Sequence, residues 1–542
     1  MTFLLHNVTL DLFETPWNTP NRLFPFLHHR AYHDMPEGCK SSDVKVLRPE
    51  KCVVWGDHPS SCAACTEDME LEKEMKGLED LIEKIKTKRR ALRTAMNRNH
   101  DHLVHKFPPE IVSQIFMQYA PTGAFFGDRS NDRSHPLYLG VVCQKWRQLA
   151  WATPELWSML RFGFRLNGVH DTSYKVLPQL VTECLERSAS LPLTVDFSTQ
   201  NVGDSIHSEV INILNNYSAR WHDVHFDLPK QHLRRLCGSS QGSILRKLAL
   251  SGPTDLTRNM FNPSDMPIFS MKSKPSPTHL TLSAFHLTSA GISWRFITVA
   301  SLHLISVDEC VELLRRTPLL ESLALLEIQP ASRIFPIPQT RILCPHLHSL
   351  ELSSIREEVV VTEILDSMRL PALRKWVHYH CFVPLDSMIS VAASSSFRLK
   401  EFRISGVEGT YEEVHNFLHH LSSLEVLQLQ FWFFAQPPTE KFLPLLCTSG
   451  GLPLEFLPHL QSLEFRFDFC SSWECILPRI LASPYRQPLK VKVDYKCHNG
   501  TVCVSNETAR RLLELVEEGT NLTIVQDGKD VLEGLKEKLE CL

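Results

Sequence analysis

The sequence predicts an α/β fold in which a long N-terminal helix and a small helical module precede a long α/β solenoid of short repeats. Three features predict it. A charged helical stretch lies within the first hundred residues, a block of closely spaced helix signals follows, and a leucine pattern then recurs almost to the end. The 542 residues are enough for about two to four domains, although a solenoid can form one long domain.

The composition is that of an ordinary folded protein, with 43% hydrophobic and 22% charged residues. A net charge of −4 argues against a dedicated nucleic-acid binder, which usually has a basic surplus. No run of about 18 apolar residues predicts a membrane span, and residues 1–26 lack the basic start of a signal peptide. We expect the sixteen cysteines to be free thiols in a reducing compartment, the cytoplasm or the nucleus.

The stretch from Glu67 to Arg98 predicts a long helix with one apolar stripe. Apolar residues recur at alternating spacings of four and three, and most residues between them are Glu, Lys or Arg. This is the pattern of a coiled-coil seam. The seam could pack on its own chain or join two copies, and in either case Leu71, Leu78 and Ile85 should be shielded from water. The seam residues are Leu71, Met75, Leu78, Ile82, Ile85, Leu92 and Met96, with Arg89 at one position.

After Phe164 an L-x-x-L-x-L pattern recurs along the chain. From Leu323 the equivalent positions follow at steps of 27, 26, 26 and 25 residues, which is the spacing of leucine-rich repeats. One such strand cannot bury its leucines alone, so neighbouring strands must stack. The full copies are Leu245-Leu248-Leu250, Leu320-Leu323-Leu325, Leu347-Leu350-Leu352 and Leu424-Leu427-Leu429. The degenerate copies are Leu280-Leu282, Leu302-Leu304, Leu399-Phe402-Ile404 and Leu460-Leu463-Phe465.

The segments between these copies predict helices and insertions. Asp308–Arg316 predicts a helix that starts at an Asp308 cap and presents Val311 and Leu314 on one face. Ser505–Glu518 predicts another helix. The Pro-rich stretch Gln329–Pro345 interrupts the period as a loop insertion.

In such an array the leucines are buried in the core. Any specificity for a bound protein must therefore come from polar strand positions and from loops. Arg403 and Gln428 alternate with inward residues, as do Glu321, His348, Glu351 and Glu425. Trp432, in the aromatic run Phe431–Phe434, could instead supply an apolar anchor.

A second set of helix signals begins at Phe107-Pro108-Pro109-Glu110-Ile111. Proline in the first turn loses no hydrogen bond, and Glu110 stands where the helix dipole favours an anion. Ile111, Ile115 and Phe116 then form an apolar stripe. A second helical stretch is expected over residues 137–151, with Leu139, Val142, Cys143 and Trp146 as its apolar positions, and a third at Thr153–Trp157.

These three segments, FPPEI, LGVVCQKWRQLA and TPELW, together resemble the F-box-like module of the large mushroom-type F-box family. The preceding Cys62-Ala-Ala-Cys65 and the long charged helix are similar to the N-terminal region of the same family. So are Arg187-Ser188 through Leu191-Pro192-Leu193, and Ser218-Ala-Arg220-Trp221. The resemblance covers roughly Cys62 to Leu350, and its motifs are specific in combination.

The resemblance implies a helical bundle that docks on a Skp-type adaptor, and through it on a cullin, in a ubiquitin ligase. The chain would be a non-catalytic receptor for an unknown protein client. Two features depart from the family pattern: Phe107 stands where Leu is usual, and the loop Pro121–Pro136 is longer than in a minimal F-box. By matched motif position the adaptor-binding residues would be Phe107, Pro108, Pro109, Glu110, Ile111, Ile115, Phe116, Leu139, Val142, Cys143 and Trp146.

The alternative is a repeat scaffold that binds partners without any ligase. No cofactor, metal, nucleic acid or membrane is expected, because Cys62-x-x-Cys65 lacks a second ligand pair nearby and no phosphate-binding or nucleophile motif occurs. The expected domains are a poorly ordered segment at 1–61, the long charged helix at 62–103, the helical module at 104–160, the solenoid at 161–525 and a C-terminal helix at 526–542.

Overall fold

The chain is a mixed α/β protein with two compact units. The first comprises the described parts of Met1–Gly163, Asn167–Leu191 and Ser205–Ile213, and the second those of Phe164–Leu166, Pro192–Asp204 and Leu214–Leu542. The expected segment 1–61 lies outside the described residues. The structure, a computed structural model, describes residues 63–120, 123–127, 135–164, 176–199, 205–238, 242–252, 267–405, 411–431, 446, 456–467, 473–482, 489–495, 505–526 and 528–540.

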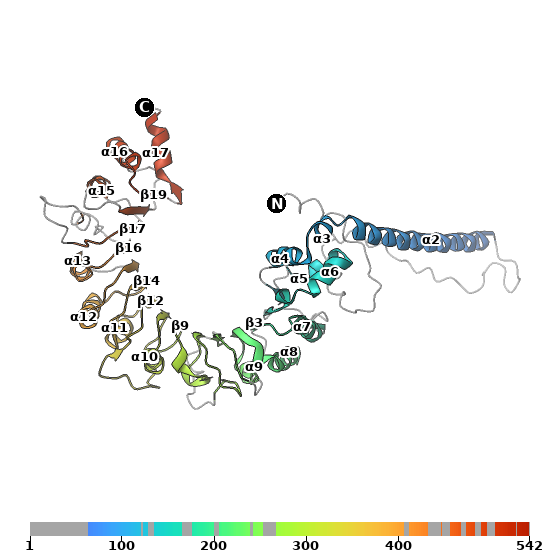
Figure 1. The fold of residues 1–542 in the computed structure, drawn as a ribbon, viewed down its shortest axis with the longest axis horizontal. Coiled ribbons are helices and arrows are strands. Elements are labelled where there is room, and N and C mark those ends of the chain that lie inside the picture. Colours follow the sequence, from blue (N-terminus) through green and yellow to red (C-terminus); the bar gives the residue numbers. More distant parts are fainter. Residues whose placement is uncertain are drawn as a thin grey trace. The chain divides into compact units, whose positions relative to one another are not determined.

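The first unit begins with the long helix α2 (Ala63–His100), which confirms the helix predicted over residues 67–98 (Figure 1). The described residues do not cover its apolar stripe, which was expected to be shielded either by its own chain or by a second copy. Leu71, Leu78 and Ile85 are 55%, 60% and 57% exposed. Values this high show that the described residues of the chain leave the apolar side of α2 open to solvent.

Short helices make up the rest of this unit, which we call the helical block. They are α3 (His102–Lys106), α4 (Pro109–Tyr119), α5 (Pro136–Val142), α6 (Gln144–Trp151), the 3₁₀ turn η1 (Pro154–Trp157) and α7 (Leu177–Arg187). The long loop predicted between the helices contains a strand, β1 (Ala124–Gly127), which pairs in parallel with β2 (Met159–Phe164).

The single helix expected over residues 137–151 is two helices that meet at Cys143. The backbone of Cys143 is extended, with φ −158° and ψ 171°. Its sulfur accepts a hydrogen bond from the N–H of Trp146 at 3.4 Å and so caps α6. A side chain that caps a helix start must stand outside the helix, which explains the break.

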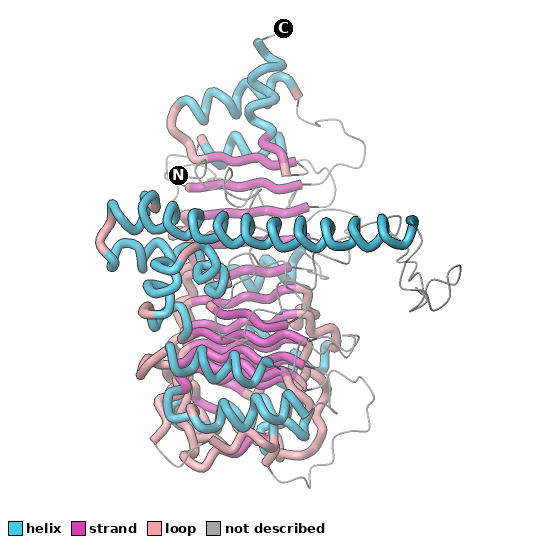
Figure 2. The backbone as a smooth tube through the Cα atoms, turned by 90° about the vertical axis from the view of Figure 1, so that its right-hand side faces the viewer, coloured by secondary structure: helices cyan, strands magenta, loops and turns pink. Residues whose placement is uncertain are grey.

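In the second unit, described strands follow one another in chain order, and each pairs in parallel with the next until the final antiparallel β19–β20 pair (Figure 2). The strands are β3 (Leu193–Thr199), β4 (Trp221–Asp227), β5 (Lys247–Ser251), β7 (His279–Ser283), β9 (Val299–His303), β10 (Ser322–Leu326), β12 (Ser349–Ser353), β14 (Lys375–Tyr379), β15 (Glu401–Ser405), β16 (Val426–Phe431), β17 (Ser462–Phe467), β18 (Lys490–Tyr495), β19 (Leu522–Gln526) and β20 (Lys529–Asp530). Two small pairs lie beside them, β6 (Phe269–Ser270) with β8 (Ala290–Gly291), and β11 (Ile342–Leu343) with β13 (Met368–Arg369).

The predicted period is confirmed by the strand register. Leu323, Leu350, Trp376, Phe402 and Leu427 are direct partners from β10 to β16, and each is at most 1% exposed. Alternation along each strand sends these residues to the covered face and their neighbours to the open one. The steps counted along the sequence are therefore the steps between stacked strands.

One predicted copy is wrong. In β9 the inward pair is Ala300 and Leu302, in register with Leu323 and Leu325 of β10, and not Leu302 and Leu304. Leu304 follows the strand at a φ of 53° and is half buried. An L-x-L spacing fits either register locally, and the neighbouring strands decide between them.

Helices lie along one side of these strands (Figure 1). They include α9 (Lys230–Leu233), α10 (Val307–Arg316), α11 (Glu358–Asp366), α12 (Leu385–Ser395), α13 (Tyr411–His419), α15 (Trp473–Leu481), α16 (Asn506–Glu517) and α17 (Val531–Glu540). The helix α8 (Ser205–Asn216) belongs mostly to the first unit. Val311 and Leu314 of α10 are buried as predicted, and Ser505 caps α16 by accepting from the N–H of Thr508.

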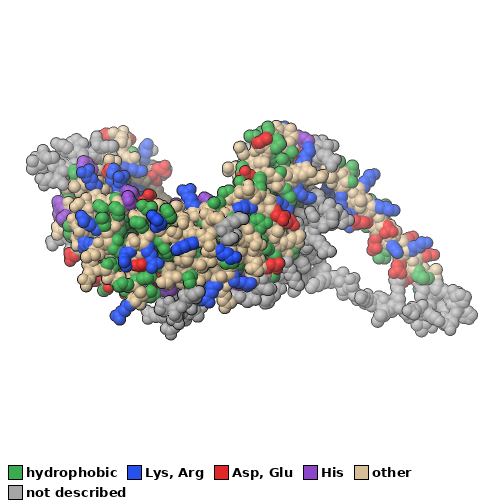
Figure 3. All heavy atoms as spheres, turned by 60° about the horizontal axis from the view of Figure 1, so that its bottom comes forward, with side chains coloured by type: hydrophobic (Ala, Val, Ile, Leu, Met, Phe, Trp, Pro, Cys, Tyr) green, Lys and Arg blue, Asp and Glu red, His purple; other side chains and the backbone are tan. Residues whose placement is uncertain are grey.

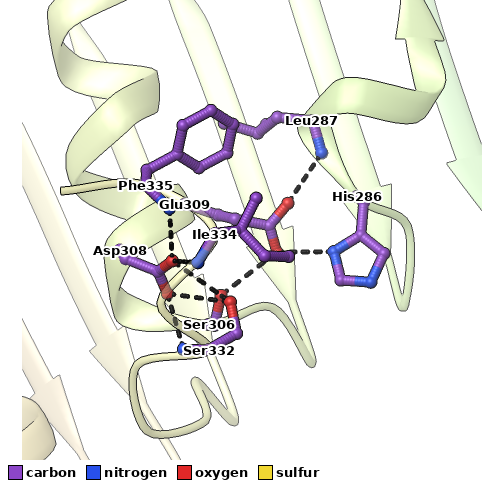
Figure 4. Close-up of polar contacts among 8 residues, drawn as sticks. All are labelled: His286, Leu287, Ser306, Asp308, Glu309, Ser332, Ile334 and Phe335. Carbon is purple, nitrogen blue, oxygen red and sulfur yellow. Dashed lines mark hydrogen bonds and ion pairs between the residues drawn. The ribbon is translucent and has the colours of Figure 1, made fainter. Parts of the chain in front are cut away.

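The expected Asp308 cap is wrong, because Ser306 occupies the cap position and Asp308 lies inside α10. Asp308 is 1% exposed, and its carboxylate accepts hydrogen bonds from the N–H groups of Ser332, Ile334 and Phe335 at 2.8, 2.8 and 2.9 Å (Figure 4). The carboxylate thus fixes the start of the Pro-rich insertion to α10.

The adjacent Glu309 ties α10 to the preceding connection. It is fully buried and accepts from the N–H of Leu287 at 2.9 Å and from the hydroxyl of Ser306 at 3.1 Å. Its other partner is Nδ1 of His286 at 2.8 Å (Figure 4). Asp308 and Glu309 therefore link α10 to the segments that follow β10 and precede β9. Their carboxylate oxygens accept hydrogen bonds from within the fold.

Candidate interaction surfaces

The helical block divides the predicted adaptor-binding residues into core and surface. Phe116, Leu139 and Cys143 are 1%, 3% and 5% exposed and belong to the core. The ring of Trp146, from α6, packs on Phe116 of α4 with ring centres 5.0 Å apart. Ile115 and Val142 are half buried, as is Trp146. These residues hold α4 against α6.

The start of α4 exposes an apolar surface. Phe107 and Ile111 are 45% and 39% exposed, and Pro108, Pro109 and Glu110 are exposed too. Pro108 stands at the cap position of α4 and Pro109 at its first residue, where proline costs no hydrogen bond. We call Phe107, Pro108, Pro109 and Ile111 the α4 strip. Contiguous exposed apolar groups on a folded block are typical of a protein-binding surface.

Asp101, which no sequence motif singled out, links α3 to the start of α6. One carboxylate oxygen caps α3 by accepting from the N–H groups of Leu103 and Val104 at 3.0 and 3.1 Å. The other lies 3.5 Å from the thiol of Cys143, which donates to it. Burial raises the pKa of Cys143, so the thiol stays protonated at neutral pH. An Asp just before a short helical run was the available signal.

Aromatic packing holds the far side of the block together. The rings of Trp151 and Trp157 meet edge to face at 5.3 Å, and the Trp157 indole N–H donates to the carbonyl of Ala150 at 2.8 Å. The Arg187 guanidinium lies 4.5 Å from the centre of the Trp151 ring. Any side chain at Gly140 would collide with Trp151, because an added Cβ would lie 2.2 Å from that ring.

The second candidate surface is the open face of the sheet. Along its middle row, Glu351, Val377, Arg403 and Gln428 are direct partners on successive strands. Arg403 and Gln428 are partners on adjacent strands and alternate with inward residues, as predicted. The same prediction is wrong for Glu321, His348 and Glu425, which directly precede β10, β12 and β16. Trp432, the third predicted client-binding residue, lies outside the described residues.

Ion pairs connect the strands at the C-terminal part of this face. Lys400 meets Glu425 at 2.7 Å, and Lys375 of β14 meets Glu401 of β15 at 3.2 Å, while Arg403 meets Glu401 within β15 at 2.6 Å. Further along, Glu464 lies 3.0 Å from Lys492. Exposed pairs of this kind contribute little to stability, at most about 1 kcal/mol each. Their consequence is an open face with alternating signs of charge.

The N-terminal part of the open face is acidic around His225. Asp196 lies 2.9 Å from His225, and Asp223 lies 3.0 Å from Lys247. The hydrogen bond to Asp196, followed by the charges of Asp227 and Asp223, raises the pKa of His225 against the opposing effect of burial. The two ends of the sheet therefore offer different electrostatic surfaces.

Across the described ranges, no group of three His, Cys, Asp or Glu side chains is placed to hold a metal ion, and no helix has the length and apolar character of a membrane span. Cys62 of the Cys62-x-x-Cys65 motif lies outside those ranges. Comparison with known proteins adds no family: no protein-family model matches the sequence, and no curated protein does.

Proposed function

We propose that this chain is a non-catalytic receptor subunit of a Skp–cullin-type ubiquitin ligase. In this proposal the helical block is an F-box-like module that binds the Skp-type adaptor. The leucine-rich-repeat-like solenoid holds a protein client. Transfer of ubiquitin is the work of a partner enzyme, and the receptor acts by raising the effective concentration of client lysines near it.

The α4 strip is the observation that supports adaptor binding. The strip leaves Phe107 and Ile111 in water at the start of a helix whose other face is tightly packed. Binding energy at protein interfaces concentrates in a few apolar anchors of this kind. Phe116, Leu139 and Cys143, also inferred from the motif, are buried in the fold, so the proposal rests on the exposed residues of the motif.

The open sheet face supports client binding. Parallel sheets are usually covered on both faces, whereas this one has helices along one side and a charged, polar second face. The free thiols of Cys143, Cys184, Cys310, Cys344 and Cys381 are buried and fit a reducing compartment, the cytoplasm or the nucleus.

Co-expression with a Skp-type adaptor tests the proposal. We expect the full chain to copurify with the adaptor, and Phe107→Asp with Ile111→Asp to lower capture at least tenfold at an unchanged melting temperature. Ile244→Asp is the matched control. Ile244 lies in the second unit and is 50% exposed, so the substitution also replaces an exposed apolar side chain by Asp, but away from the α4 strip.

Failure of the unaltered chain to bind the adaptor would reject the ligase function. It would leave the repeat scaffold as the better account. Undiminished capture by the folded double variant would place the adaptor surface elsewhere.

A further inference from the structure

The exposed stripe of α2 is a long apolar feature that the proposed function leaves without a role. We call its residues the α2 seam. Every apolar member is more than half exposed, from 51% at Ile82 to 61% at Met75. From Leu71 to Met96 the seam runs about 38 Å along the helix, at about 1.5 Å per residue. A stripe of this length at coiled-coil spacing needs a partner helix.

The charges of α2 are strongly divided between its two halves. Residues 67–82 contain seven acidic and two basic residues, a net charge of −5. Residues 83–98 contain one acidic and seven basic residues, a net charge of +6. Figure 3 shows this division, with acidic side chains (red) gathered towards the N-terminal end of the long helix and basic ones (blue) towards its C-terminal end. A helix with this division attracts a second copy that runs in the opposite direction.

We propose that α2 pairs with α2 of a second copy of this chain in an antiparallel coiled coil. The inference does not depend on the ligase function. In heptad terms, Met75, Ile82, Arg89 and Met96 are a positions, and Leu71, Leu78, Ile85 and Leu92 are d positions. One antiparallel register places every a residue opposite a d residue. Ile82 then faces Ile85, Met75 faces Leu92, and Met96 faces Leu71.

The residues beside the seam select the same direction. At the e positions, the antiparallel register sets Glu72 against Arg93 and Glu79 against Lys86, so that all four make attractive pairs with the partner helix. A parallel pair would instead set Glu74 against Glu79 and Lys88 against Arg93, which are like charges. The flanking charges therefore favour antiparallel pairing and oppose parallel pairing.

Arg89, the one charged seam position, fits the same arrangement. A parallel pair would place Arg89 against Arg89 of the partner inside the seam. In the antiparallel register, Arg89 faces Leu78, in the acidic half of the partner helix. Its aliphatic stem can cover Leu78 while the guanidinium reaches the surrounding carboxylates.

Sedimentation equilibrium of the full chain tests the pairing. The unaltered chain should have twice its monomer mass of 62.1 kDa. Glu72→Lys with Glu79→Lys should reduce it to the monomer mass, because Lys then faces Arg93 and Lys86. Adding Lys86→Glu and Arg93→Glu to that variant should restore the dimer, since every e pair becomes attractive again.

The matched control is Glu70→Lys with Asp80→Lys. It makes the same change in charge in the same half of α2, at positions that face away from the seam, and should leave the dimer intact. Circular dichroism should show equal helix content in all variants, because the substituted side chains are exposed or, at Arg93, half-buried.

Each other outcome overturns the proposal. A monomeric unaltered chain at high concentration would reject self-pairing. A dimer that survives or tightens in Glu72→Lys with Glu79→Lys would indicate parallel pairing or another interface. Loss of the dimer in the control would show a general charge effect and no specific pairing.

Discussion

Two regions of this molecule repeat leucines at regular spacing, and the leucines meet opposite environments. In α2, Leu71, Leu78 and Leu92 are 55–60% exposed. In the strands of the second unit, Leu350 and Leu427 are fully buried. Both patterns are easily seen in the sequence, and both predict an element correctly. A periodic apolar pattern thus defines a face of an element and leaves open what covers that face.

The difference follows from where the covering partner comes from. A strand of the sheet finds its neighbours about 26 residues away in the same chain, as the step from Leu350 to Trp376 shows. The helix α2 has no second copy of itself within one chain. The described residues leave its seam uncovered, and we propose that a second molecule supplies the partner helix.

The largest expected effect is loss of a strand leucine. Leu350→Ala should lower the free energy of unfolding by about 2–5 kcal/mol, because the site is closely packed and a cavity would remain. Leu78→Ala removes the same atoms from the α2 seam and should leave the stability of the second unit unchanged. Denaturant unfolding followed by Trp fluorescence compares the two. Equal losses would contradict the division between the two regions.

The second largest effect is expected at His378, a titratable residue at a strand position where the neighbouring strands have apolar residues. His378 takes an inward position of β14, where its partners on either side are Leu352 and Ile404, and is fully buried. Its Nε2 lies 2.6 Å from the carbonyl of Phe382 and donates to it. Burial lowers the pKa of His378 from 6.5 to about 4, although the bond to Phe382 opposes the shift.

The sign of the pH dependence follows from that lowered pKa. The unfolded chain binds this proton more readily, so the contribution of His378 to stability is complete above pH 6.5 and is lost as the pH falls towards 4. The loss is on the order of 3 kcal/mol. His378→Leu should flatten the unfolding free energy over this interval. A variant as acid-sensitive as the unaltered chain would show that His378 is not responsible.

A smaller effect is expected where a carboxylate fixes the insertion. Asp308→Asn should lower stability by roughly 1–3 kcal/mol, since an amide cannot accept all the N–H groups that converge there. Burial alone would raise the pKa of Asp308, but the hydrogen bonds from Phe335, Ser306 and Ser332 outweigh it and lower the pKa below 3.8. The stabilisation is therefore present above about pH 4 and is lost below it.

Hydrogen exchange of residues 332–335 measures that effect locally. Their amides should exchange faster in Asp308→Asn than in the unaltered chain. Unchanged protection would mean that the Pro-rich insertion holds its place without the carboxylate.

The smallest effect concerns α2 alone. An added Cβ at Gly77 would have no atom within 4 Å, so Gly77→Ala costs nothing in packing. The change should stabilise the helix by about 1 kcal/mol. Slower exchange of the α2 amides, with no change in the strands of the second unit, is the expected result. Faster exchange would mean that Gly77 has a packing role in the pair.

Sequence reasoning succeeded where the determining contacts repeat. The steps from Leu323 to Leu427 predicted the register because every strand obeys the same rule. It failed at Asp308, whose partners lie 24 to 27 residues away in a stretch without periodicity. The sequence also predicted α5 and α6 as one helix, because a cysteine that caps a helix cannot be told from an apolar residue inside one.

For the candidate adaptor site, the sequence predicted the group of residues but not which of them are exposed. The motif located the helical block, but an apolar stripe does not show which side faces water. Packing resolves this, with Phe116 inside and Ile111 outside on the same helix.

Hydrogen–deuterium exchange of the full chain with a purified Skp-type adaptor tests the central claim most directly. The α4 strip should lie beneath the adaptor, so the amides of Glu110–Gln114 should exchange several-fold more slowly in the complex, while those of the β10–β16 strands keep their rates. Phe107→Asp with Ile111→Asp should abolish the protection. An absence of protection, or protection confined to the strands, would contradict the account.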